Sequence, residues 1–316
     1  MLPRSLALSF LTLSLAAANA AACSSCGCTL NSDWVSQGLD SKPGFTLDLR
    51  YDFIDQTALR EGNGSVPAPA IPAAEEVEQR TTNRYATATL GYNPNRAWGF
   101  SVVLPYLDRS HSTIVDGDTD ITTSHTRSLG DIKLMARYQG FSRDGDSGLI
   151  IGLKLPTGSR DFLFNGGPQA GTDLDRSLQP GTGSTDLIIG GFRTGSLSRD
   201  WDWYAQGLVQ APVRIRDGFR PGTVFSVNGG FRYMALNRWE QQVQINALQR
   251  RPDGGVNGDA ATSGGRSLYV SPGLVYTPGQ KLSLYGFAQL PVVQHVTGMQ
   301  LAPRWSAAVG VSMHFN

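Results

Sequence analysis

The three cysteines near the start of the chain have the spacing most typical of chemistry. Cys23, Cys26 and Cys28 form a CxxCxC run, and the chain has no other cysteine. In an oxidising compartment two of these thiols would pair as a disulfide or structural tether, the simplest interpretation. As thiolates they would suit a thiophilic metal such as copper, or exchange disulfides with a periplasmic redox or metal partner. A lipid on Cys23 is a third alternative. Because three is an odd number, one thiol stays free or pairs with another chain.

The remaining residues offer no second reactive group. His111 and His125 fall in one expected loop, and no Ser/His/Asp arrangement or paired-carboxylate motif can be argued from spacing. We therefore expect a protein that is not an enzyme. The formal net charge of +1 gives no indication of a nucleic-acid partner.

The first twenty residues are typical of a secretory signal peptide. Arg4 precedes an apolar run over residues 6–17, and Ala18-Asn19-Ala20 is a cleavage site of the A-x-A type. The apolar run is too short to span a bilayer, and no later segment approaches the ~20 apolar residues of a membrane helix. Export is therefore expected, with residues 21–43 forming a cysteine-bearing periplasmic segment.

From Gly44 to Phe315 apolar and polar residues alternate in about a dozen segments. Alternation with a period of two places one set of side chains on each face of a strand. The mean hydropathy of -0.20 suits a barrel in which only alternate residues meet lipid. The expected strands are 44–57, 80–93, 96–109, 126–142, 147–160, 183–197, 200–215, 223–237, 238–250, 266–278, 280–295 and 303–315.

The connections between these segments alternate between short and long. Turns such as Asn93-Pro94-Asn95-Arg96 are tight, whereas 58–79, 110–125, 161–182, 216–222, 251–265 and 296–302 are longer links. Short periplasmic turns and longer extracellular loops are the outer-membrane plan. The sequence thus predicts an all-β fold, a transmembrane antiparallel β-barrel of about 12 strands over residues 44–316, with both ends in the periplasm.

Large aromatic residues gather near the expected strand ends. An aromatic girdle at the periplasmic interface of the membrane accounts for this clustering. Its expected members are Trp98, Trp201, Trp203, Trp239, Trp305 and Phe315.

Charged residues of both signs occupy the opposite strand faces and would line the lumen. Charges inside a barrel of this size must be paired or hydrated. Two alternatives stay open, a narrow polar channel with a weak preference for anions and a plug of salt-bridged side chains. The lumen-lining candidates are Asp48, Arg50, Asp52, Asp131, Lys133, Arg137, Lys154, Asp202, Arg214, Arg232, Glu240, Lys281 and Arg304.

Three phrases resemble the outer-membrane family named for the MetA pathway of phenol degradation. They are Leu129-Gly130-Asp131-Ile132, the run from Gly152 to Gly158, and the run from Gln179 to Asp186; the closing strand 305–315 is similar as well. The resemblance implies passage of small solutes, with aromatic or apolar molecules as one class. It implies no catalytic residue. Loop 161–182 could fold inward as a constriction, although a structured rim is the simpler interpretation.

The sequence therefore favours an outer-membrane channel or transporter for passive passage of small solutes, with membrane lipid and the solute as its partners. The alternative is a barrel scaffold whose CxxCxC segment binds a thiophilic metal or exchanges disulfides with a periplasmic partner.

Overall fold

The computed structural model describes residues 42–67, 76–115, 117–141 and 144–315. The expected signal peptide and all three cysteines lie outside these residues. The strands are β1 (Gly44–Gly62), β2 (Gly64–Ser65), β3 (Val77–Asn93), β4 (Trp98–Ile114), β5 (Thr122–Leu129), β6 (Lys133–Tyr138), β7 (Ser147–Lys154), β8 (Thr185–Ser196), β9 (Trp201–Arg214), β10 (Val224–Leu236), β11 (Trp239–Arg250), β12 (Gly265–Gly279) and β13 (Leu282–Phe315).

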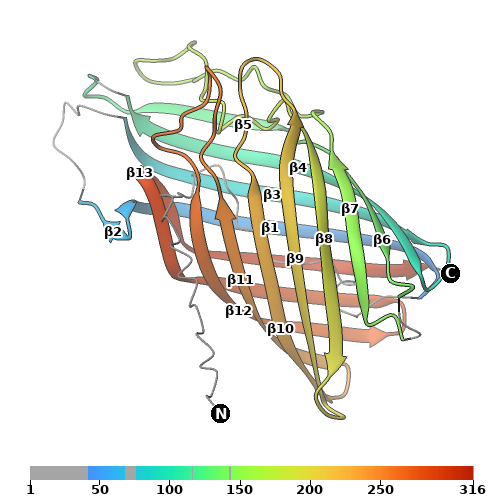
Figure 1. The fold of residues 1–316 in the computed structure, drawn as a ribbon. Helices are drawn as coiled ribbons and strands as arrows, with labels where there is room; N and C mark the ends of the chain where they lie inside the picture. The colour runs from blue at the N-terminus through green and yellow to red at the C-terminus, as the bar shows by residue number, and fades with distance from the viewer. Residues whose placement is uncertain (1–41, 68–75, 116, 142–143, 316) are drawn as a thin grey trace, which may run out of the picture.

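These strands form one closed antiparallel sheet (Figure 1). Closure comes from β1 and β13, which pair along their whole shared length, beginning with Phe45 opposite Phe315. A closed sheet has no edge strand, so its backbone polar groups are satisfied within the wall. The fold is a transmembrane β-barrel, as the sequence predicted.

In the part of the chain that the structure describes, the wall contains twelve strands, and three details explain this count. The short β2 only extends the end of β1. Strands β5 and β6 pair with successive parts of β4, so together they make one wall strand interrupted at residues 130–132. Strand β13 makes two, because its first arm pairs with β12 and its second arm with β1. The arms lie side by side, since the Ser306 hydroxyl donates to Gln289 Oε1 over 2.9 Å.

Short turns lie at one end of the barrel and most long connections at the other, at the upper left of Figure 1. Both β1 and β13 have their free ends at the short-turn end, as an even strand number requires. One expectation is wrong, because 296–302 is not a long link. The two arms of β13 turn tightly around Gly298, whose φ of 57° is left-handed backbone that glycine adopts without strain.

The alternation of side chains follows the sequence pattern. On β1, Leu49 and Tyr51 are exposed on the outer face, whereas Asp48 and Asp52 are buried on the inner face. Among the described residues no helix has both the length and the apolar character needed to cross a membrane.

Charge introduced on the outer face should destabilise the barrel where that face meets lipid. Ile245 on β11 is exposed and lies six residues beyond Trp239. We expect Ile245→Arg to lower the free energy of unfolding by about 2–4 kcal/mol in lipid vesicles. Urea titration followed by tryptophan fluorescence measures this change.

Val256→Arg is the matched control, because Val256 is 90% exposed in the connection between β11 and β12. Equal losses for the two variants would contradict the lipid-facing assignment of Ile245.

Candidate functional site

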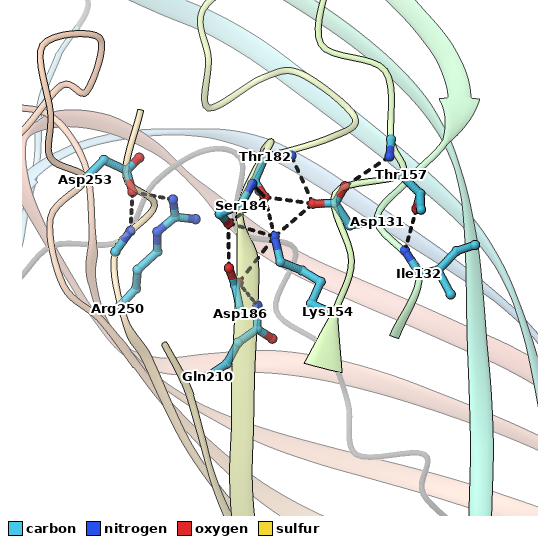
Figure 2. Close-up of polar contacts among 12 residues, drawn as sticks. Asp131, Ile132, Lys154, Thr157, Thr182, Ser184, Asp186, Gln210, Arg250 and Asp253 are labelled. Atoms are coloured by element: carbon cyan, nitrogen blue, oxygen red, sulfur yellow. Dashed lines mark hydrogen bonds and ion pairs between the residues drawn. The ribbon is translucent and has the colours of Figure 1, made fainter. Parts of the chain in front are cut away.

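The three motif segments converge on one buried ion cluster inside the wall (Figure 2). Lys154, the last residue of β7, donates to Asp131 Oδ2 over 2.8 Å and to Ser184 Oγ over 3.2 Å. Its ammonium also lies 3.3 Å from Asp186 Oδ2 at the start of β8, and it donates to Thr182 Oγ1. The structure thus brings Asp131 and Lys154, two of the expected interior residues, into direct contact.

Asp131 holds the two ends of the loop between β7 and β8. Its Oδ1 accepts the Gly158 amide over 3.0 Å, and its Oδ2 accepts the Thr182 amide over 3.0 Å. Because Gly158 and Thr182 are 24 positions apart, one carboxylate closes nearly the whole of loop 155–184. We call this contact set, Asp131, Lys154, Gly158, Thr182, Ser184 and Asp186, the loop clasp.

Glycines allow the loop ends to meet. A Cβ added to Gly181 would lie 2.1 Å from the carbonyl oxygen of Gly158, and one added to Gly158 would lie 2.7 Å from the Cα of Gly181. Neither position has room for a side chain. Thr157 completes the closure, since its hydroxyl accepts the Ile132 amide and donates to the Gly130 carbonyl. The motif residues therefore close the loop between β7 and β8, a role that their spacing in the sequence did not reveal.

In this cluster one cation lies between two carboxylates, and all three side chains are buried. Lys154, Asp131 and Asp186 are each less than 10% exposed. Asp186 is further bound by Ser184 Oγ at 2.5 Å and by Gln210 Nε2 at 2.7 Å. Removing one partner of a buried ion pair destabilises the fold by more than the intact pair stabilises it, because the remaining charge stays buried without a counter-ion. The polar side chains of the clasp are bonded to each other and to the two ends of the loop, so the clasp positions the loop.

Loop 155–184 returns to the inner face of the barrel. Phe164, Leu174 and Leu178 form a small buried apolar cluster within it. Arg109, which is buried on the inner face of β4, donates from Nη1 to the Leu178 carbonyl over 2.6 Å and from Nε to Asn83 Oδ1 over 2.6 Å. The loop therefore folds inward against β4. Of the two alternatives for residues 161–182, an inward fold and a structured rim, this is the first.

Several other expected interior residues are paired on the inner face. Arg50 bonds Asp52 over 2.8 Å. Arg232 lies 3.1 Å from Asp202 and 3.9 Å from Glu240. The remaining pairs join Arg137 to Asn93 Oδ1 and Asp48 to the Tyr285 hydroxyl.

Lys133 differs from these residues. It is opposite both Val103 and the buried Lys154, so its side chain shares their inner face. It forms no hydrogen bond or ion pair with another described residue. The charged groups near enough to act on it are Lys154, Asp186, Arg50 and Asp131.

Three expected interior residues are exposed instead. Lys281 lies in the turn between β12 and β13, and Arg214 ends β9. Arg304 falls in a bulge, where Asp55 faces Trp305 and Gln56 faces Pro303. An extra residue in one strand breaks the alternation of faces, so the period of two could not place Arg304.

The aromatic residues separate into two groups. Trp98, Trp201, Trp239 and Phe315 are exposed at the short-turn end, with Trp203 two residues further along β9. Trp305 is opposite Asp55, ten residues from the strand end, and contacts Phe53 with ring centroids 5.5 Å apart. Its expected place in the periplasmic girdle is wrong, because the turn at Gly298 puts the start of that arm at the other end of the barrel.

Sequence reasoning missed several residues that hold the interior. Asp186, Thr182 and Ser184 lay within a quoted motif, which was the available signal. No sequence signal marked Arg109 and Tyr285, because their partners Leu178 and Asp48 are remote in sequence. Among the described residues no group of three His, Cys, Asp or Glu side chains could hold a metal.

The closed sheet and its lipid-compatible outer face define a β-barrel protein of the outer membrane. The chain belongs to the family described as "Putative MetA-pathway of phenol degradation", whose model matches residues 39–292. Comparison of the sequence with curated proteins gives no match.

Solved structures share the fold at low sequence identity. An outer membrane channel from Pseudomonas putida F1 is similar with a TM-score of 0.58 and 12% identity, covering 86% of this chain and 96% of that chain. The beta domain of the Bordetella autotransporter Brka gives a TM-score of 0.53 and 14% identity, covering 86% and 100%. The transport unit of the autotransporter AIDA-I from Escherichia coli gives 0.51 and 9%, covering 91% and 93%.

Weakening the loop clasp should expose loop 155–184 to protease. Asp131→Asn removes the negative charge that accepts the Lys154 ammonium and two loop amides. A hydrogen bond to a charged group contributes about 1.5–3 kcal/mol, so local opening should become about tenfold more frequent or more. Trypsin cleavage after Arg160 or Arg176, followed by mass spectrometry, measures it.

Asp144→Asn in the exposed turn between β6 and β7 is the control. Cleavage in Asp131→Asn at the wild-type rate would refute the role of the clasp.

The loop should also respond to pH through Glu76. Desolvation at this position and the carboxylate of Asp175, with smaller contributions from Glu78 and Asp259, raise the pKa of Glu76 to about 8. The closed state thus holds a proton that an opened state would release, so closure weakens as pH rises from the ordinary carboxyl range through about 8.

We expect opening, measured as trypsin cleavage corrected for an unfolded substrate, to rise several-fold from pH 7 to pH 9. Glu76→Gln should abolish this rise, whereas Glu61→Gln, at an exposed position near the end of β1, should retain it. A rise of the same size in Glu76→Gln would assign the effect to another group.

Proposed function

We propose that the protein is a passive outer-membrane channel for small solutes, with aromatic molecules that carry a negative charge as its preferred class. The observation that carries this proposal is the inward-facing ammonium of Lys133, which lacks a counter-ion among the described residues. An unpaired charge inside a barrel is stable only if it is hydrated, and hydration supports a water-filled path.

Other inner-face groups support a hydrated interior. Asn246 Oδ1 and Gln289 Nε2 are buried and have no hydrogen-bond partner among the described residues. Buried polar atoms of this kind are normally satisfied by ordered water. The interior is thus more polar than a packed core and suits dissolved ions better than a dry plug.

Lys133 supplies the positive charge that would attract anions. Of the nearby cations, Lys154 is paired with Asp131 and Asp186 and Arg50 with Asp52, so neither adds a further positive charge to the path. Rings of basic side chains are how pores select anions. The family description supports the aromatic class, and the similar channel from Pseudomonas putida F1 supports passage through a barrel of this shape.

The decisive experiment is single-channel recording of the refolded protein in a planar bilayer, with chloride, then benzoate and phenol as added solutes. We expect steady conductance, a higher permeability for chloride than for potassium, and stronger block by benzoate than by phenol. Lys133→Gln should lower the anion preference and the benzoate block several-fold, because it removes the unpaired charge and keeps a polar side chain.

Lys281→Gln is the matched control, since Lys281 is exposed in a turn outside the barrel interior. A correctly folded barrel that never conducts would refute the channel. Conductance with unchanged selectivity in Lys133→Gln would refute only the role of Lys133.

A further inference from the structure

The outer face of the barrel carries a cluster of arginines at its long-loop end. Along β4 the outward residues are apolar or aromatic up to Tyr106, and the next one is Asp108. Asp108 is opposite Arg84 of β3 on one side and Arg127 of β5 on the other. Strands β3, β4 and β5 are neighbours (Figure 1), so the change from apolar to charged residues occurs in one row across them.

The cluster continues into the next rows. Asp55 of β1 accepts a two-pronged hydrogen bond from Arg80, at 2.8 and 2.9 Å. His125 lies 3.0 Å from Asp108. We call this set the outer arginine patch: Arg80, Arg84 and Arg127 with His125, Asp55 and Asp108. Three arginines against two aspartates leave a net positive charge.

The height of the patch matches a membrane interface. Asp108 is ten residues beyond Trp98, which lies at the short-turn end of the same strand. At about 3.4 Å per residue and a tilt of about 40°, this separation is about 26 Å along the barrel axis, close to the ~25 Å apolar band of outer-membrane barrels. The contact between Phe53 and Trp305 adds an aromatic pair at this level, which is typical of the interface.

The arginines retain hydrogen-bonding capacity toward the outside. The side chains of Arg80 and Arg127 are 58% and 62% exposed, and that of Arg84 is 39% exposed. Arg127 bonds Asp108 through Nε alone, and Arg84 makes a single contact of 3.5 Å with it. The aspartates thus hold the guanidinium groups in place and leave terminal N–H donors directed at the surroundings.

We propose that the outer arginine patch binds the phosphate groups of a phosphorylated glycolipid headgroup in the outer leaflet. Long loops mark the extracellular end of a barrel, so this row meets the outer leaflet. Guanidinium groups recognise phosphate through paired N–H donors, and basic clusters beside a membrane attract anionic headgroups. The site lies on the outer wall and is independent of the proposed channel.

The test uses purified full-length mature protein in detergent micelles and a fluorescently labelled lipid A that carries two phosphates. Arg84→Gln combined with Arg127→Gln should weaken binding about tenfold or more, because two cations near the headgroup are lost. Arg84→Lys with Arg127→Lys should recover most of the affinity. Arg193→Gln, on the outer face near the short-turn end of β8, should bind as the wild type does.

Two further arms identify the ligand. Lipid A without its phosphates should bind about as weakly as it does to the double glutamine variant, and inorganic phosphate at millimolar concentration should not displace the labelled lipid. Equal affinity in wild type and double variant, equal binding of the dephosphorylated lipid, or displacement by free phosphate would each overturn the proposal. Heat-modifiable electrophoretic mobility confirms that every variant is folded.

Discussion

Pairing between β1 and β13 is the interaction on which the rest of the structure depends. Within hydrocarbon each unpaired backbone amide or carbonyl costs several kcal/mol, so a sheet that crosses a membrane must have no free edge. The register from Phe45 opposite Phe315 to Gly62 opposite Val296 removes both edges at once. It also decides which side chains face inward, because each residue of β1 shares a face with its partner on β13.

At one place in the closed wall a strand ends before its neighbour does, and the loop clasp lies there. Strand β7 ends at Lys154, whereas β5 continues toward the loops and is bridged on that side by Gly166 of loop 155–184 at Thr123. Pro156 follows the end of β7 and cannot donate to a strand ladder. The carboxylate of Asp131 accepts loop amides where a continuing strand would have supplied carbonyl oxygens, so the motif residues complete the wall with side-chain hydrogen bonds.

The same alternation gives the barrel two different charged surfaces. Inside, most ions of the described residues are paired and buried, and the proposed channel rests on Lys133, which has no such partner among them. Outside, ions such as Arg84 and Asp108 appear only beyond the apolar band, where water and headgroups can solvate them. One strand, β4, contributes to both surfaces through neighbouring residues, Arg109 inward and Asp108 outward.

The class of fold, the number of wall strands and the face of most strand residues could be predicted from the residue pattern, because a period of two is a local property of the backbone. The sequence also marked Asp131 and Lys154 as interior candidates, without indicating that they meet each other and Asp186. Three features could not be predicted in this way: loop 155–184 folds inward, 296–302 is a tight turn, and Arg304 lies in a bulge. Each of these depends on register between segments distant in sequence, and a shift of one residue reverses the face of every side chain that follows.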